Sequence, residues 1–481
     1  MIIKFKVPLI AKNSAIYIVF NILQRAINFF LLPLYTIYLT PEDYGITNVL
    51  TSAATLLTFL LTFSVQAASS RFHYKYIRNE DIVKNIWGSN LLFIMINSLF
   101  WSILAIIGYN YSLRYLIGDE IPFYPYVLIC IFNCCFSPIF LYFQSYLQTK
   151  QNARYYTINN FLHFFCLLSL TIFVVVVVQM KALGVILANT ITNGIFAIYA
   201  ICAMRRYVNY RFSFTILKKS LLYSVPLLPH TLSGWLNSML DRIFINRIIN
   251  LTNVGLYSIA YQFGLIISMI GMGINQAYTP FFFKNHTSDE GKHKISLIAD
   301  FSIVIVCFVG LILALFSQEI LYFMTDTKFH NVWPVIIILV AANLFDCIYK
   351  NCVVVLFLDK TRQLSIISIF CSLATCMLNY FLISSIGYKG AAITYLIVQF
   401  LVSIIVCIYS HKIRPDIKFN SYLHYKEIII MMSIIYATTF SLANMQLLQR
   451  SLLKIFIFFL VCMLLLLLNY KTIIKFINKN V

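Results

Sequence analysis

Charged side chains are scarce in this chain of 481 residues. Lys and Arg number 36, Asp and Glu only 16, and together they make up 11% of the sequence. A soluble protein carries about one charged residue in four. Hydrophobic residues make up 61%. At about 20 apolar residues per crossing, this composition builds roughly 14 spanning helices and leaves little chain for a domain outside the bilayer. The sequence therefore excludes a soluble enzyme and predicts an all-α, polytopic integral membrane protein.

Signatures of catalysis and of nucleotide or metal binding are missing as well. The sequence has no G-x-x-x-x-G-K-[ST] phosphate loop and no H-E-x-x-H motif. Its 12 cysteines all fall in apolar stretches, where they are interpreted as small buried hydrophobes and not as disulfides or zinc ligands. We therefore expect no catalytic residues, no metal, no cofactor and no ATP hydrolysis, which favours a secondary transporter. The net charge of +20 is attributed to membrane topology and not to nucleic acid.

Long apolar runs separated by charge, Gly and Pro define the predicted spans. They lie at 14–39, 46–69, 86–107, 122–147, 155–179, 183–204, 221–245, 254–283, 295–316, 332–357, 364–383, 388–409, 428–446 and 452–470. Most Lys and Arg residues fall in the loops that are cytoplasmic if the chain starts in the cytoplasm. Because basic residues collect in cytoplasmic loops, both termini are predicted to be cytoplasmic.

A weak internal repeat appears when the chain is shifted by 210 residues, because Gly45 then meets Gly255 and Gln66 meets Gln276. The matches fall at equivalent places in spans 1 to 6 and 7 to 12, which predicts a parallel pseudo-twofold repeat of two six-helix lobes. The predicted organisation is an N-terminal lobe (1–204), a cytoplasmic linker (205–220), a C-terminal lobe (221–411), a cytoplasmic loop (412–427), and two peripheral helices with a cytoplasmic tail (428–481).

Ionisable residues within spans are candidates for function because a charge in the bilayer is costly unless it is paired or hydrated. Arg25 lies near the middle of the first span. It is predicted either to grip an anionic substrate in a central cavity, since a guanidinium binds phosphate oxygens in a bidentate manner, or to be satisfied by helix carbonyls or a carboxylate. Asp346 and Lys350 stand four residues apart on one helix face, which predicts a structural ion pair or a coupling-ion or proton site.

Other polar residues in the spans allow two interpretations each. Asp241 and Arg242 form either a solvated pair at a helix end or part of the substrate site, and Gln66 and Gln276 either bond across helices or line a hydrophilic lumen. His163 is interpreted as a hydrogen-bonded filler or as a titrating group.

Four motifs resemble one family of exporters. They are LTPEDYG at 39–45, Asp241-Arg242 followed by VGLYSIA at 254–260, KALGV at 181–185, and KGAA at 389–392. With these, the chain resembles the polysaccharide transporters (Wzx-type flippases for lipid-linked oligosaccharides and O-antigen) of the multidrug/oligosaccharidyl-lipid/polysaccharide exporter superfamily. The resemblance implies twelve core helices in two lobes around a central cavity, two peripheral helices, and a glycan substrate joined through diphosphate to a polyprenol. It places Arg25 where related peptidoglycan-precursor flippases have a cavity arginine, whereas the further arginines expected in spans 2 and 8 are absent from this sequence.

The leading hypothesis is therefore a flippase that moves a polyprenyl-diphosphate-linked repeat unit from the cytoplasmic to the periplasmic leaflet of a bacterial inner membrane. Its partners would be the lipid-linked glycan, membrane lipids and a polysaccharide polymerase of the same pathway, with no nucleic acid. The alternatives are a cation-coupled multidrug antiporter of the same superfamily, which needs carboxylates in its lumen, and a membrane glycan polymerase or ligase, which needs a large outer catalytic segment.

Overall fold

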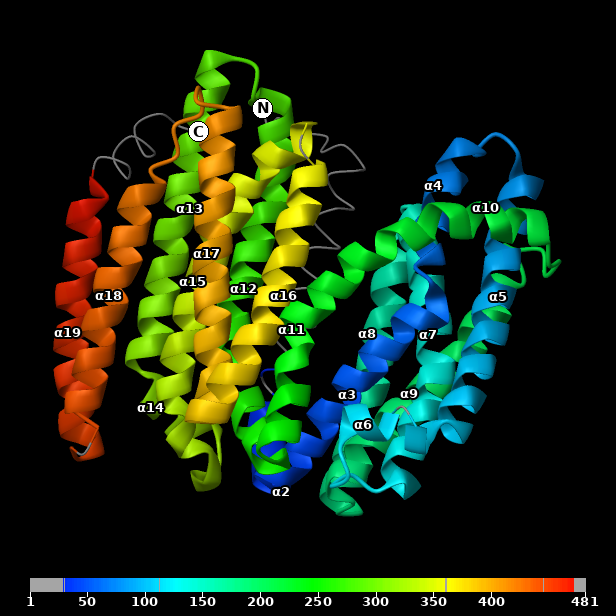
Figure 1. The fold of residues 1–481 in the computed structure, drawn as a ribbon, viewed down its shortest axis with the longest axis horizontal. Helices are drawn as coiled ribbons and strands as arrows, with labels where there is room; N and C mark the ends of the chain where they lie inside the picture. Colours follow the sequence, from blue (N-terminus) through cyan, green and yellow to red (C-terminus); the bar gives the residue numbers. More distant parts are fainter. Residues whose placement is uncertain (1–28, 30, 112, 360, 444, 471–481) are drawn as a thin grey trace, which may run out of the picture. The chain divides into compact units, whose positions relative to one another are not determined.

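The protein is a bundle of long helices. The structure is a computed structural model that describes residues 29, 31–111, 113–359, 361–443 and 445–470. In these residues there are eighteen α-helices and no strand (Figure 1). Eleven of the described helices are long and apolar enough to cross a bilayer. The predicted fold class, an all-α polytopic membrane protein, is confirmed.

The described chain forms two compact units, one running from Tyr38 to Gly255 and the other comprising the segment that ends at Ile37 together with the chain from Leu256 onward. The first unit contains α3 (Pro41–Thr62), α4 (Val65–Lys75), α5 (Glu80–Ile107), α6 (Leu113–Ile117), α7 (Leu128–Thr149), α8 (Ala153–Ile172), α9 (Lys181–Met204), α10 (Phe214–Ser224) and α11 (Leu228–Ile248). The second contains α2 (Leu32–Tyr38), most of α12 (Leu251–Asn285), α13 (Asp289–Leu315), α14 (Ser317–Met324), α15 (Trp333–Asp359), α16 (Thr361–Ile386), α17 (Tyr388–Ile413), α18 (Ser421–Ser441) and α19 (Leu447–Leu468). The lobe boundaries predicted from the span order stay a prediction.

Most predicted spans coincide with a helix to within a few residues, but two are broken. The run 46–69 is divided between α3 and α4 at Phe63 and Ser64, which both have positive φ angles (44° and 53°). The side-chain amide of Asn97 donates to the carbonyls of Leu60 and Leu61 at 2.9 and 2.8 Å and so satisfies groups that the break leaves open. The run 221–245 is divided between α10 and α11 by a 3-10 turn around Pro226, whose ring nitrogen cannot donate.

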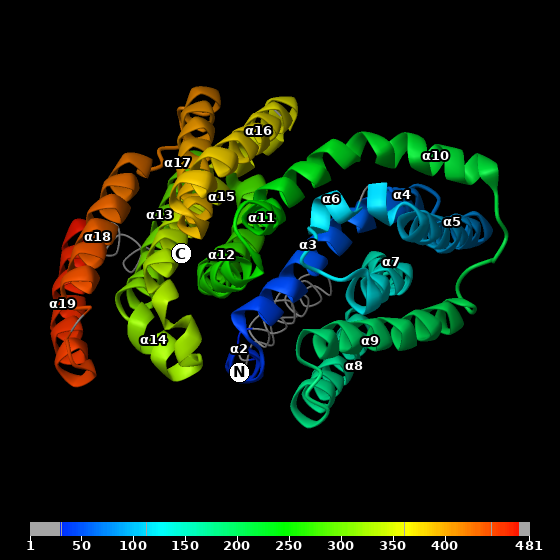
Figure 2. The ribbon, with the colours of Figure 1, turned by 60° about the horizontal axis from the view of Figure 1, so that its bottom comes forward.

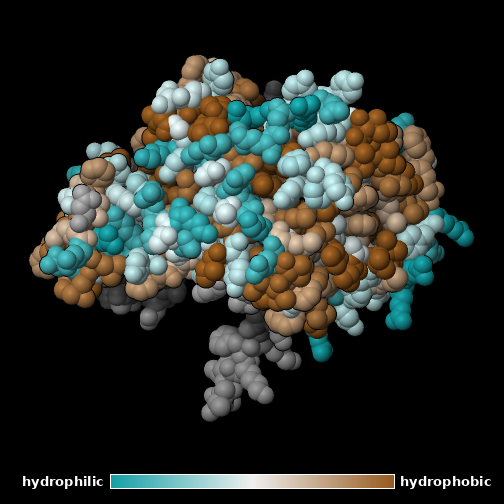
Figure 3. All heavy atoms as spheres, turned by 90° about the horizontal axis from the view of Figure 1, so that it is seen from below, coloured by the Kyte–Doolittle hydropathy of each residue, from teal (hydrophilic) through white to brown (hydrophobic). Residues whose placement is uncertain are grey.

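Three predicted spans are missing from the eleven candidates. The first, 14–39, lies mostly outside the described residues. The other two correspond to α11 and α18, which have 21 residues each and carry more polar side chains. Hydrophilic residues are scattered among hydrophobic ones over the end face in Figure 3, as expected where helices end and loops begin.

The first turns of α3 and α12 touch through their backbones. α3 starts with a capping box, in which the Thr40 hydroxyl accepts from the Asp43 amide at 3.1 Å and the Asp43 carboxylate accepts from the Thr40 amide at 3.0 Å. A Cβ on Gly45 would lie 2.0 Å from the Leu251 carbonyl oxygen, and one on Gly255 would lie 1.8 Å from that of Pro41. Shifting the chain by 210 residues converts each of these contacts into the other, while the division into two repeated lobes stays a prediction.

The helices α18 and α19 are joined to α13 and α14 by buried polar side chains. The two ring nitrogens of His424 lie 3.1 Å from Asp300 and 3.0 Å from Glu427, and Asn469 donates to Glu427 at 2.7 Å. Farther along α19, Arg450 and Lys454 pair with Glu319 at 2.6 and 2.8 Å. Pairing of this kind offsets part of the desolvation free energy that buried charged groups would otherwise cost.

Candidate substrate pocket

Arg25, the predicted substrate anchor, lies outside the described residues. Asp346 and Lys350, the ion pair predicted within a span, both lie in α15. The Lys350 ammonium lies 2.6 Å from the Asp346 carboxylate and also donates to the hydroxyl and carbonyl of Ser268 on α12, at 3.1 and 3.3 Å. The ion pair is therefore present and joins α12 to α15, while the choice between a structural and a coupling role stays a prediction.

The remaining predicted site residues are dispersed over three helices. Asp241 and Arg242 are buried in α11, where the Arg242 guanidinium donates to the Ser238 carbonyl at 2.7 Å. Gln66 is half-buried in α4, and its side-chain oxygen has no hydrogen-bond partner among the described residues. Gln276 is exposed on α12 in the second unit. Their part in substrate binding stays a prediction.

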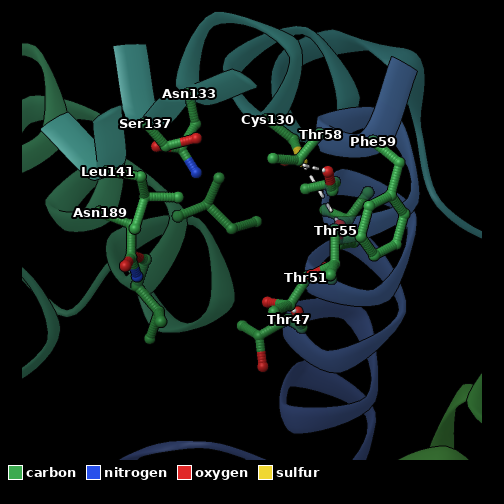
Figure 4. Close-up of a pocket in the computed structure, with 14 residues that line it drawn as sticks. Thr47, Thr51, Thr55, Thr58, Phe59, Cys130, Asn133, Ser137, Leu141 and Asn189 are labelled. Atoms are coloured by element: carbon green, nitrogen blue, oxygen red, sulfur yellow. Dashed lines mark hydrogen bonds between the residues drawn. The ribbon is translucent and has the colours of Figure 1, made fainter. Parts of the chain in front are cut away.

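A pocket lined by both polar and apolar side chains lies within the first unit, between α3, α7 and α9. Its volume is about 280 Å³. The residues that line it are Thr47, Leu50, Thr51, Ala54, Thr55, Thr58, Phe59, Cys130, Asn133, Ser137, Leu141, Val185, Ile186 and Asn189 (Figure 4). None of these side chains is charged, so the described wall offers hydroxyl and amide groups beside apolar patches.

One wall of the pocket is a stripe of threonines on α3. Thr51, Thr55 and Thr58 each donate their hydroxyl to the carbonyl four residues earlier, at 2.7 to 2.9 Å, and Thr47 donates to the carbonyl of Tyr44 at 2.8 Å. A threonine hydroxyl has one proton and two lone pairs. Because the proton is used within the helix, each threonine presents hydrogen-bond acceptors to the pocket.

The opposite wall, on α7, presents hydrogen-bond donors. The Asn133 side-chain oxygen accepts from the Asn193 amide at 2.8 Å, and the Asn193 oxygen lies 3.0 Å from Nε2 of His163. With the amides oriented in this way, Nε2 of His163 carries the proton, and the NH₂ group of Asn133 is left for the pocket. Figure 4 shows Asn133 and Ser137 facing the α3 threonines across the pocket. The Ser137 hydroxyl has no partner among the described residues.

Reasoning from the sequence missed this pocket because it weighed ionisable residues and glutamines in the spans. The signal was nevertheless present as Thr47, Thr51, Thr55 and Thr58, whose spacing of four, four and three puts all four on one face of a helix. His163 turns out to be hydrogen-bonded and stacked on Phe140, with ring centroids 4.7 Å apart.

Comparison with known proteins identifies the family. The polysaccharide biosynthesis protein family matches residues 10–286, more than half of the chain. The chain belongs to this family. A relative, "Lsg locus putative protein 1" of Haemophilus influenzae, is 24% identical to this chain over 337 residues, which cover 66% of this chain and 77% of that protein. The resemblance stated from the sequence motifs is thereby confirmed.

Solved structures of two transporters share the fold of the present chain. The lipid II flippase MurJ, in an inward closed conformation, matches with a TM-score of 0.72 at 14% identity and covers 95% of this chain and 99% of its own. An inward-facing multidrug resistance MATE family transporter of the MOP superfamily matches with a TM-score of 0.64 at 13% identity, covering 82% of this chain and 94% of its own. The fold is thus one that a flippase and a multidrug transporter also adopt.

Proposed function

We propose that the protein is a flippase that moves a polyprenyl-diphosphate-linked oligosaccharide from the cytoplasmic to the periplasmic leaflet by alternating access. The oligosaccharide would be the repeat unit of an O-antigen, capsule or exopolysaccharide. In this proposal the protein lies in a bacterial inner membrane with both termini in the cytoplasm, catalyses no reaction, and delivers its substrate to a polysaccharide polymerase. The observation that carries the proposal is the uncharged, hydroxyl- and amide-lined pocket of the first unit.

The pocket is complementary to a sugar. Each sugar hydroxyl can donate one hydrogen bond and accept others, and the pocket has acceptors on α3 opposite donors on α7. Apolar side chains such as Phe59, Leu50 and Ile186 lie beside them and suit the C–H faces of a sugar ring. Ligand sites commonly combine such apolar walls with a few placed polar groups.

A multidrug antiporter for organic cations is the second candidate. Such a protein needs carboxylates where the cation binds, and no Asp or Glu lines the described pocket. Arg25, if it lies in the substrate path, would repel a cation and attract the diphosphate. We therefore retain Arg25 as the proposed diphosphate contact, with Gln66, Gln276, Asp241 and Arg242 as candidates for the rest of the path.

The test is the pair of substitutions Thr51→Val and Thr55→Val in one chain. Valine has the shape of threonine without the oxygen, so the pocket keeps its volume and loses two acceptors. At about 0.5–1.5 kcal/mol per hydrogen bond, the loss of both should slow glycan flipping by roughly fivefold to a hundredfold. The measurement is flipping of a polyprenyl-diphosphate-linked oligosaccharide in vesicles that contain the purified protein.

Thr62→Val is the matched control. Thr62 lies on the same helix, donates to the Thr58 carbonyl at 2.9 Å and accepts a long hydrogen bond of 3.3 Å from the Ser64 amide, but it does not line the pocket. We expect this variant to flip glycan at the normal rate. Normal flipping by the double variant at equal protein abundance, or efficient export of organic cations by the unmodified chain, would contradict the proposal.

A further inference from the structure

The segment that connects α9 to α11 is fixed against the end of the first unit. The amide of Ser213 donates to the Ser89 hydroxyl at 3.1 Å, and that hydroxyl donates back to the Ser213 carbonyl at 3.2 Å. Asn90 donates to the Ser220 hydroxyl at 3.0 Å, and the Asn209 amide donates to the Lys84 carbonyl at 3.2 Å. This connection therefore holds α10 in place on α5.

The helix α10 lies crosswise to the long helices of its unit. Figures 1 and 2 both show it across the end of the bundle beside α4 and α5. One of its faces packs on the unit, with Leu217, Ser220 and Ser224 buried. It is too short to cross a bilayer, so its exposed apolar side chains cannot be explained by a membrane-spanning position.

A second face of α10 is apolar and exposed. Phe214 and Leu222 are 70% and 69% exposed, and Val225 just beyond the helix is 43% exposed. At 100° per residue these positions fall on one side of the helix, next to the buried face. Together with Lys218, they line a hollow of about 350 Å³. Large apolar side chains in this position would be unfavourable in water.

The same segment is strongly basic. Residues 205–225 contain Arg205, Arg206, Arg211, Lys218 and Lys219 and not one Asp or Glu. All five basic side chains are exposed, and in the part of the chain that the structure describes none of them forms an ion pair. Lys218 lies among the apolar residues of this face and lines the hollow with them, and its hydrocarbon stem can follow the apolar face while the ammonium reaches the water.

We propose that α10 and the basic residues around it form a binding site for an anionic phospholipid of the cytoplasmic leaflet. An acyl chain occupies the hollow along Phe214 and Leu222, and the phosphate pairs with Lys218 and Lys219. A short helix that exposes large apolar side chains together with lysines, and that has no acidic residue, fits the plane of an anionic membrane surface. Nucleic acid would match the charge but would leave the apolar face in water. The inference does not rest on the transported substrate.

The experiment measures binding of fluorescent phosphatidylglycerol to the purified full-length protein in nanodiscs of phosphatidylcholine. The variant is Lys218→Gln with Lys219→Gln. Each basic residue near an anionic surface contributes a factor of about five, so we expect roughly thirtyfold weaker binding. The matched control is Lys412→Gln with Lys426→Gln, which removes the same charge from two other exposed lysines, predicted to be cytoplasmic, and should bind almost normally.

A second pair of substitutions tests the apolar half of the site. Phe214→Ser with Leu222→Ser changes two exposed side chains and should preserve the fold, while weakening phosphatidylglycerol binding at least fivefold. If the variant at Lys218 and Lys219 and the control at Lys412 and Lys426 lost phosphatidylglycerol binding equally, only net charge would matter, and that result would overturn the proposal. So would unchanged binding in the serine variant, or full competition by millimolar inorganic phosphate, which would identify a site for a free anion.

Discussion

At the scale of single residues, the pair Asp346 and Lys350 shows what a buried charge requires. Both side chains are mostly buried, at 13% and 16% exposure, and Lys350 adds two contacts with Ser268. Breaking a buried pair leaves one charge without compensation, which costs more than the pair itself contributes. The energetic effect of each residue therefore depends on its partner.

We expect Lys350→Met to lower the free energy of unfolding by about 3 kcal/mol, because it leaves the Asp346 carboxylate without its ammonium. The double variant with Asp346→Asn should be less destabilised than Lys350→Met alone. Thermal unfolding of the detergent-purified variants measures this order. Flipping lost by the double variant at normal membrane abundance would support the coupling role for the pair instead of the structural one.

The sequence predicted this pair because an i,i+4 spacing of opposite charges fixes its geometry locally. The pocket was harder to predict, because Asn133 and Thr55 lie in different helices and only the packing of α7 on α3 brings their polar groups face to face. The chain of hydrogen bonds from His163 through Asn193 to Asn133 likewise joins three helices. Contacts of this kind depend on the register between helices, which hydrophobic periodicity does not specify.

At the scale of elements, apolar runs and charge located most helices well, since a membrane helix must be long and apolar. Breaks within a run were less visible. Pro226 marks one in the sequence, whereas the break at Phe63 and Ser64 depends on Asn97 from another helix. The motif LTPEDYG was informative in a further way, because it contains both the α3 cap and the glycine that meets α12.

The contact of α3 with α12 has no room for a side chain. We expect Gly45→Ala to destabilise the protein by about 1–3 kcal/mol, because the new methyl would meet the Leu251 carbonyl oxygen, a backbone atom that cannot rotate away. Gly234→Ala on α11 is the control, since nothing lies within 4 Å of its added Cβ. The measurement is the thermal midpoint of each purified variant, and equal midpoints would contradict the close contact.

At the scale of the whole molecule, the helices α18 and α19 are held by polar groups as well as by apolar packing. His424 is 1% exposed and lies between the carboxylates of Asp300 and Glu427. Between helices in a membrane, apolar contact distinguishes poorly between a neighbouring helix and lipid, whereas a buried hydrogen bond is specific. The polar cluster therefore fixes where these peripheral helices attach.

We expect His424→Phe to destabilise the second unit by about 3–5 kcal/mol, because two buried carboxylates lose their shared partner. Tyr422→Phe serves as the control on the same helix, since Tyr422 is 84% exposed. The rate of limited proteolysis at the α17–α18 connection, measured for both variants at the same temperature, reports whether α18 and α19 have detached. Equal protection of both variants would show that apolar packing alone holds these helices.

If the proposed flippase function holds, the threonine stripe of α3 matters in the state in which the pocket contains no glycan. An empty polar cavity in a membrane is costly chiefly when it contains N–H or O–H groups with no acceptor, whereas an oxygen with spare lone pairs is tolerated more readily. Thr51, Thr55 and Thr58 have their protons bonded within the helix. In the proposed flippase this wall of the pocket therefore has no unpaired donor when glycan is absent, whereas the NH₂ group of Asn133 on the opposite wall would need water or glycan as its acceptor.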